Sequence, residues 1–181
     1  MSLSDTIVRI VSGCVLSISL AHAHASAQLD LIGYKTQQPS GWKQEVSANN
    51  MRVAQFHVPG ASGQEAGQSV VFYFGRAQGG SVEANIQRWE SNFSGAKGKP
   101  VKAVVRKSKI GAAMPVTWAE MNGSYARGVG MGVAGEVKPD QTLLVAIVET
   151  PKGNLTFQIY GPKKSVAAQR KAFEGMVMGL R

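Results

Sequence analysis

The sequence predicts an α+β fold in which helices flank an antiparallel β-sheet. Strand-like runs outnumber helical segments, neighbouring runs are joined by short turns, and two segments have the apolar period of amphipathic helices. The chain has 181 residues, of which 44% are hydrophobic and 17% charged, a composition typical of globular proteins. The expected element order is β-β-β-α-β-β-β-β-β-α. The sequence shows no internal repeat and no interdomain linker, so we predict a single α+β domain over residues 28–181.

The first strands precede the first helix. Residues 29–40 indicate a short strand that leads into the turn Pro39-Ser40-Gly41-Trp42. Residues 51–58 form a strand-like run that ends at Pro59-Gly60. The run VVFYF at residues 70–74 is the most apolar short segment, which predicts a buried strand.

The first helix is predicted from a change of period. Ser81 is a residue type that caps helices, and Glu83 lies in the first turn, where a negative charge is favourable. The expected apolar face consists of Val82, Ile86, Trp89 and Phe93. Gly95 and the Lys/Gly-rich stretch after it end the helix.

The second half of the chain contains strands and a final helix. Residues 101–110 and 114–121 indicate two strands, residues 125–137 a further glycine-rich strand, and Pro139-Asp140 a turn. The apolar runs at 142–150 and 155–160 flank Pro151-Lys152-Gly153-Asn154 and predict a hairpin. The last segment, residues 165–180, is a predicted helix whose apolar face consists of Val166, Phe173, Val177 and Leu180.

The hexapeptide GMGVAG at residues 130–135 fits the G-x-G-x-x-G pattern of dinucleotide-binding loops. That fingerprint requires a preceding strand and a helix that begins within the loop. Here Pro139 follows too closely for a helix, and no βαβ unit encloses the motif. We therefore interpret the segment as a glycine-rich strand or hairpin and predict no nucleotide cofactor.

The N-terminus has the features of an export signal. A short region containing Arg9 precedes an apolar stretch at residues 10–21, and Ala25-Ser26-Ala27 matches a signal-peptidase site. This pattern predicts a signal peptide over residues 1–27, with cleavage before Gln28 and a periplasmic or extracellular protein.

An alternative for the N-terminus is a lipoprotein. Val11-Ser12-Gly13-Cys14 resembles a lipobox, in which Cys14 would be lipidated and would tether the protein to a membrane. Few apolar residues precede Cys14, and the apolar stretch continues beyond it, so the cleavable signal is the favoured interpretation. A membrane tether is expected only if Cys14 is lipidated.

The chain after residue 27 has few residue types for catalysis. It contains no cysteine and one histidine, His57, and its net charge remains +9 because the leader carries only Asp5 and Arg9. This inventory predicts no metal site, and no G-x-S-x-G nucleophile motif is present. We therefore predict no cofactor, no catalytic residues and a non-enzymatic protein. A hydrolase that uses His57 is the alternative, because composition alone permits a Ser-His-Asp triad.

The densest charge feature lies between Glu90 and Glu120, where there is no acidic residue. One hypothesis is a basic patch that binds phosphates, anionic lipid head groups or acidic proteins. The other is a solvated edge strand whose lysines prevent edge-to-edge pairing. The stretch has no aromatic residue between Phe93 and Trp118, so no nucleic-acid partner is expected. The basic residues are Lys97, Lys99, Lys102, Arg106, Lys107 and Lys109. Among the aromatic residues, Trp42, Tyr73, Trp89 and Trp118 are interpreted as core or lid residues rather than a ligand cage, and Trp42 and Trp118 are the better candidates for a pocket wall.

Several segments together resemble exported bacterial proteins of unknown function. They are the Pro39-Ser40-Gly41-Trp42 turn, VVFYFG, VEANIQRW, AIVETPKGN and YGPKKSVAAQRKAF. The early Pro-x-Gly-Trp turn and the closing amphipathic helix are similar to the PsbP-like superfamily, and the resemblance covers residues 39–181. It implies an α/β/α sandwich and a role in binding or assembly with a protein or envelope partner. It transfers no site residue and no role in a photosystem.

Overall fold

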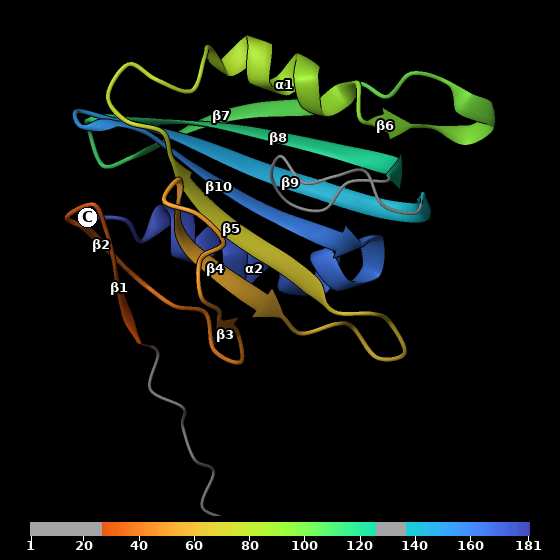
Figure 1. Ribbon diagram of the computed structural model, residues 1–181, viewed down its shortest axis with the longest axis horizontal. Coiled ribbons are helices and arrows are strands. Elements are labelled where there is room, and N and C mark those ends of the chain that lie inside the picture. Colours follow the sequence, from red (N-terminus) through yellow and green to blue (C-terminus); the bar gives the residue numbers. More distant parts are fainter. Residues whose placement is uncertain (1–26, 126–136) are drawn as a thin grey trace, which may run out of the picture.

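The computed structural model describes residues 27–125 and 137–181. In these residues an eight-stranded antiparallel sheet lies between two α-helices, and a separate two-stranded hairpin packs beside it (Figure 1). Helix α1 (Val82–Glu90) lies on one face of the sheet and helix α2 (Lys163–Met178) on the other. The predicted α+β class and the α/β/α sandwich implied by the resemblance are confirmed.

The strands of the sheet are ordered β3-β4-β5-β10-β9-β8-β6, and β7 also pairs with β8. Their bounds are β3 (Lys43–Gln44), β4 (Arg52–Val58), β5 (Gly67–Tyr73), β6 (Phe93–Ser94), β7 (Val104–Ile110), β8 (Met114–Tyr125), β9 (Lys138–Thr150) and β10 (Gly153–Pro162). β7 to β10 form a meander, including the predicted β9–β10 hairpin. The long-range β5–β10 pairing joins this meander to the N-terminal strands.

The two faces of the sheet carry separate hydrophobic clusters because successive residues of a strand point to opposite faces. Trp118 belongs to the cluster that packs against α2, together with Phe56, Phe157 and Phe173. The next residue, Ala119, belongs to the cluster that contains Trp89 of α1. This alternation determines which residues of the outer strands face each helix.

The predicted apolar faces of both helices are largely confirmed. In α1, Trp89 is buried and Val82 and Ile86 are half-buried, whereas Phe93 lies beyond the helix in β6. The backbone N–H of Ala84 donates to Ser81 Oγ at 3.1 Å, which confirms the predicted N-cap. Around α2, the predicted residues are all buried, namely Val166, Phe173, Val177 and Leu180. No helix in the described ranges is long and apolar enough to cross a bilayer.

Residues 29–40, predicted as one strand, instead form a hairpin of β1 (Gln28–Leu31) and β2 (Tyr34–Gln37). The turn residues Ile32 and Gly33 both have positive φ, +56° and +88°, as a two-residue type I′ turn requires. Glycine adopts this conformation easily, but isoleucine does not. A turn at Ile32 is therefore not predicted from its residue type. Arg181 then extends the hairpin, because its backbone N–H and C=O both bond to Lys35.

The predicted turn at Pro139-Asp140 is also wrong, since both residues lie within β9. The β8–β9 register shifts there, so that these two residues oppose Ser124 alone. A bulge of this kind accommodates a proline inside a strand, and Asp140 takes the positive φ of +50°. Tyr125 is the last residue of β8; the GMGVAG segment and the rest of the predicted strand up to residue 136 lie outside the described residues.

Candidate binding surface

Strand β7 forms an outer edge of the sheet. It pairs with β8, and no other strand of the described residues lies along its outer side. Its first two residues are apolar and exposed to solvent, with 71% of Val104 and 47% of Val105 accessible. Three of the six predicted basic residues, Arg106, Lys107 and Lys109, also lie on this strand. An edge strand presents backbone N–H and C=O groups that no neighbouring strand satisfies.

On the α2 side of β7, Arg106 is held by two contacts. Its Nη2 lies 2.5 Å from Glu174 Oε1 on α2, and its guanidinium carbon lies 4.1 Å from the centroid of the Trp118 ring. Trp118 Nε1 in turn donates to Ser108 Oγ at 2.8 Å. Arg106 therefore links α2 to the sheet through an ion pair with Glu174 and a cation–π contact with Trp118.

On the α1 side, β7 and α1 enclose a hollow of about 310 Å³, which we name the strand hollow. Val105 and Lys107 contribute from β7, and Thr117 contributes from β8. The remaining lining residues are Val82, Glu83, Ile86, Gln87, Glu90 and Lys102. The hollow exists because α1 contacts the sheet mainly through Trp89 near its C-terminal end, leaving Val82 and Ile86 half-buried.

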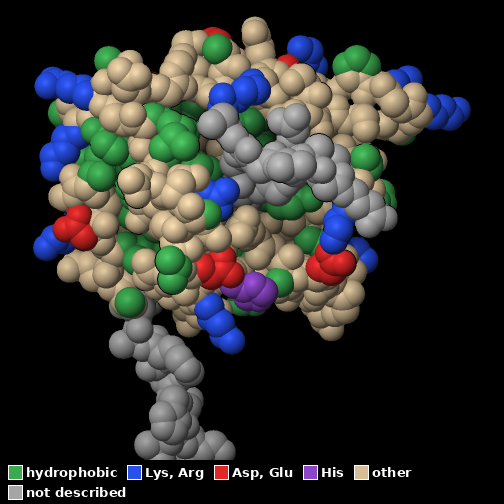
Figure 2. All heavy atoms as spheres, viewed as in Figure 1, with side chains coloured by type: hydrophobic (Ala, Val, Ile, Leu, Met, Phe, Trp, Pro, Cys, Tyr) green, Lys and Arg blue, Asp and Glu red, His purple; other side chains and the backbone are tan. Residues whose placement is uncertain are grey.

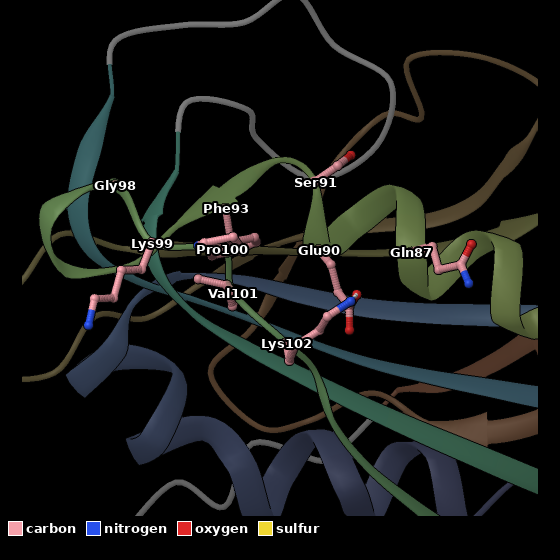
Figure 3. A pocket seen from close by; sticks show the side chains of 9 residues that line it. All are labelled: Gln87, Glu90, Ser91, Phe93, Gly98, Lys99, Pro100, Val101 and Lys102. Carbon is pink, nitrogen blue, oxygen red and sulfur yellow. Dashed lines mark hydrogen bonds and ion pairs between the residues drawn. The ribbon is translucent and has the colours of Figure 1, made fainter.

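A second hollow of about 390 Å³, the loop hollow, lies beside the strand hollow (Figure 3). It lies between the end of α1 and the loop that leads into β7. The lining residues are Gln87, Glu90, Ser91, Phe93, Gly98, Lys99, Pro100, Val101 and Lys102. Gln87, Glu90 and Lys102 line both hollows. We use the name α1–β7 surface for the two hollows together with Val105, Lys107 and Lys109, the exposed residues on the α1 side of β7.

The boundary between the hollows is an ion pair. Lys102 Nζ lies 2.9 Å from Glu90 Oε2, and the backbone N–H of Ala103 donates to Glu90 Oε1 at 2.8 Å. Figure 3 shows the Glu90 and Lys102 side chains reaching toward each other, whereas Lys99 points away from the pair. The hydrogen bond from Ala103, and then the contact with Lys102, hold the pKa of Glu90 below its ordinary value of 4.5. Glu90 therefore ties the start of β7 to α1 as an ionised carboxylate.

Glu90 and Lys102 differ in how much of each side chain reaches solvent. The Glu90 side chain is 13% exposed, but that of Lys102 is 82% exposed. An exposed ammonium keeps most of its hydration, so this pair costs little to rearrange. Lys102 can therefore turn toward an external anion while Glu90 retains its bond to the backbone.

The six basic residues that were predicted as a patch fall into separate groups. Lys97 and Lys99 lie at the short 3₁₀ helix η1 (Ala96–Gly98), and Lys102 pairs with Glu90. Lys107 and Lys109 share the α1 side of β7, and Arg106 faces α2. On the face drawn in Figure 2, Lys and Arg side chains (blue) are scattered over the middle and the edges rather than gathered in one place. Anion binding by the whole set stays a prediction.

The alternative catalytic residue, His57, is exposed on β4. It lies opposite Lys43 of β3 and Gln68 of β5, and its side chain makes no hydrogen bond or ion pair with the described residues. In the same ranges no cluster of three or more His, Cys, Asp or Glu side chains has the arrangement of a metal site. The triad that a His57 hydrolase would need has therefore not been assembled around this imidazole by the described residues.

The core interpretation of Trp42 and Trp118 is confirmed, and their candidacy as pocket walls is wrong. Both are core residues, 3% and 1% exposed. Trp42 packs against Phe56 and donates from Nε1 to Gln169 Oε1 at 2.9 Å, and Trp118 packs edge-on against Phe173. Each indole N–H has a hydrogen-bond partner, which allows a large aromatic residue outside the main periodic faces to be buried.

The two hollows were not predicted from the sequence. The strand hollow is lined by residues as far apart in the chain as Val82 and Thr117, which come together only because β7 pairs with β8. One local signal was available. The pair Val104-Val105 stands immediately before Arg106-Lys107, so that one strand carries both apolar and basic side chains. On an edge strand, this pattern leaves at least part of the apolar area in water.

No protein-family model matches the chain, and no curated protein matches its sequence. Solved structures do match its fold. A protein of unknown function from Pseudomonas aeruginosa, described as a putative regulator, aligns with a TM-score of 0.51 and 12% identity over 86% of this chain and 96% of its own. The Ran-binding protein Mog1p of Saccharomyces cerevisiae aligns with a TM-score of 0.50 and 11% identity over 86% and 94%.

A cyanobacterial PsbP from Synechocystis aligns with a TM-score of 0.50 and 11% identity, over 95% of this chain and 98% of that chain. At such low identities the matches concern the arrangement of helices and strands. That arrangement is the one implied by the sequence resemblance. The chain therefore has the fold shared by PsbP-like and Mog1-like proteins.

Proposed function

We propose that this protein is a non-enzymatic binding module that docks a partner protein on its α1–β7 surface. The observation that carries the proposal is the edge strand β7, on which exposed Val105 lines the strand hollow together with Lys107, and exposed Val104 adds apolar area at the edge. When a partner covers exposed apolar area next to a hollow, that area is removed from water, which favours association. The surrounding polar rim provides specificity.

The charge of the protein supports an acidic partner. The full chain has a net charge of +9, and Lys107 and Lys109 lie on the same side of β7 as the strand hollow. A positive surface attracts acidic proteins from a distance and repels basic ones. The nearby acids, Glu83 and Glu90, line the hollow itself, and Glu90 is already engaged by Lys102 and Ala103.

The fold is compatible with this function. One of the structural matches is described as a Ran-binding protein, so a protein with this arrangement of layers binds another protein. Function resides in particular surfaces rather than in the fold, so the partner of that protein is not transferred to this chain. The proposal rests on the exposed residues of β7 and on the neighbouring hollows.

We also propose that the protein is exported and meets its partner in the cell envelope. The leader pattern in residues 1–27 supports export, and β1 begins at Gln28, the first residue after the proposed cleavage site. Mass spectrometry of the protein from its native cells tests this directly. A mature N-terminus at Gln28 supports the cleavable signal, a diacylglycerol adduct on Cys14 supports the tether instead, and an intact leader contradicts both.

The docking surface is tested by site-specific photo-crosslinking. A photoreactive residue at Val105 is expected to give a discrete adduct with an acidic protein in cell-envelope extract. The matched control carries the same residue at Val46, which is 93% exposed between β3 and β4. The Lys107→Glu/Lys109→Glu variant is expected to weaken the Val105 adduct. Equal labelling from both positions, or no discrete adduct from Val105, contradicts the proposal.

The hydrolase alternative is tested on the same protein. The purified mature chain is expected to show no esterase, phosphatase or peptidase activity above background, because His57 is exposed and unpartnered within the described residues. Activity that disappears in His57→Ala, with unchanged thermal stability, would replace the binding function by a catalytic one.

A further inference from the structure

We propose that the partner binds as an extended acidic segment that adds a strand to the outer edge of β7. This inference rests on the proposed function and specifies how the partner is held. Recognition would then come from backbone hydrogen bonds along β7, with side-chain pairs setting the preference for an acidic sequence.

The first step is the length and accessibility of the edge. β7 has seven residues, and each forms a Cα pair with β8 from Val104↔Glu120 to Ile110↔Met114. In a regular antiparallel ladder, alternate residues direct their N–H and C=O groups away from the paired strand. The outer side of β7 therefore offers the N–H and C=O groups of every second residue to an incoming chain, and no described strand uses them.

The opposite edge of the sheet does not offer this. There β3 covers β4 at Phe56 and His57, and the chain continues with a hydrogen bond from Glu45 N to Gln55 O at 2.8 Å. Among residues 27–125 and 137–181, one edge of the sheet is thus shielded by a short strand, and no strand lies along the long edge at β7. A partner that adds a strand would find its site at β7.

The side chains of β7 indicate the chemistry of the partner. Val105, Lys107 and Lys109 alternate on the α1 side, so an added strand would place its own side chains next to an apolar residue and then next to two cations. Directly opposed unlike charges stabilise a strand pair, and like charges destabilise it. An added segment with acids at alternate positions fits Lys107 and Lys109.

The same charges disfavour a second copy of this chain as the occupant. Two β7 edges would bring Arg106, Lys107 and Lys109 close to the same cations of the other copy, and each full chain carries a net charge of +9. Lysines on edge strands are a common protection against such self-pairing. Protection alone does not account for the two adjacent exposed valines, which add apolar area to the edge.

The inference is tested with a fluorescent peptide that alternates Glu with Val and Thr, added to the mature protein. Fluorescence anisotropy measures binding, and hydrogen exchange measures protection of the β7 amides. We expect binding together with new protection at alternate residues of β7. The same peptide with N-methyl groups on all of its backbone amides is expected not to bind, because neither of its edges can then donate hydrogen bonds to β7.

Two variants that change the net charge equally distinguish cross-strand charge pairs at β7 from the effect of net charge alone. Lys107→Glu/Lys109→Glu is expected to weaken the peptide by about tenfold, since two favourable cross-strand pairs become unfavourable. Lys163→Glu/Lys164→Glu changes exposed residues at the start of α2 and is expected to leave affinity within about twofold. Equal weakening in both variants shows that only net charge matters and overturns the inference.

The remaining outcomes distinguish this inference from the proposed function. If the N-methylated peptide binds as well as the parent, strand addition is wrong, although docking of an acidic protein can stand. If no acidic peptide binds while the Val105 photo-crosslink still captures its partner, strand addition is again overturned and the docking surface is retained. Loss of the Val105 adduct itself removes the proposed function and, with it, this inference.

Discussion

The two faces of the sheet are covered by helices to very different extents. α2 has 16 residues and contributes Ser165, Val166, Phe173, Met176 and Val177 to the buried interior. α1 has nine residues, of which Trp89 is buried. The α2 face therefore contains the larger core cluster, whereas the α1 face has two hollows at its outer side.

This difference indicates a division of roles between the faces. Contacts on the α2 side use apolar area and charge pairs to hold the fold together, and Arg106, Glu174, Arg170 and Glu120 form a chain of ion pairs along its margin. Contacts on the α1 side are fewer, so exposed side chains there can meet a partner at small cost to stability. Mutations should therefore reduce stability mainly on the α2 face and affect binding mainly on the α1 face.

The largest expected effect is from Phe173→Ala. Phe173 is fully buried against Trp118, and removing its ring should lower the free energy of unfolding by about 3–5 kcal/mol. Urea unfolding followed by circular dichroism measures the change. Met178→Ala is the control on the same helix, because Met178 is 40% exposed and should change stability by less than about 0.5 kcal/mol. Similar losses in both variants would contradict the division.

A smaller effect is expected from Ile86→Ala on the other face. Ile86 is half-buried beside Trp89 and lines the strand hollow, so its truncation should cost about 1–2 kcal/mol. The same urea titration measures the cost, and the photo-crosslink from Val105 reports whether the enlarged hollow alters docking. A loss as large as that of Phe173→Ala would show that α1 is as important to the core as α2.

Ser81→Ala tests how firmly α1 is held. Losing the bond from Ala84 N–H to Ser81 Oγ should cost about 1 kcal/mol and should fray the first turn of α1. Hydrogen exchange of the α1 amides should rise while that of α2 stays unchanged. Ser81→Asp keeps a capping oxygen and should behave like the parent protein; equal fraying in this variant would exclude a capping effect.

The smallest expected effect is from Glu90→Gln, and it depends on pH. The pKa of Glu90 is lowered in the folded state, so its ionised form contributes stability that is present above pH 4.5 and is lost as pH falls through the lowered value. The variant should be less stable than the parent by under about 1 kcal/mol at neutral pH, with the difference shrinking in acid. Urea titrations at pH 7 and at pH 3 measure it.

Lys102→Gln sharpens the Glu90 prediction. It removes the second contribution to the lowered pKa but leaves the hydrogen bond from Ala103, which is the larger one. In Lys102→Gln, the dependence of the free energy of unfolding on pH should therefore be weaker than in the parent protein but still present. A difference between Glu90→Gln and the parent that stays constant from neutral to acid pH would show that the charge of Glu90 does not stabilise the loop before β7.

Local patterns in the sequence were sufficient to predict most elements. The period of Val166, Phe173 and Val177 predicted α2, and the run at residues 70–74 lies largely within β5, because burial imposes an apolar pattern on each element separately. The turn at Ile32 and the bulge at Pro139-Asp140 could not be predicted, because each uses a residue in a conformation or a position that its type disfavours.

The sequence by itself determined the alternation of elements, the shortage of catalytic side chains after the predicted leader, and the positive charge. Tertiary structure decided which basic residues lie together. Arg106 and Lys107 are neighbours in the chain but lie on opposite faces of the sheet, and Lys107 meets Ile86 of α1 across the strand hollow. A strand directs successive side chains to opposite sides, and pairing with β8 sets what each side meets, so only the folded sheet identifies the surface that is free to bind.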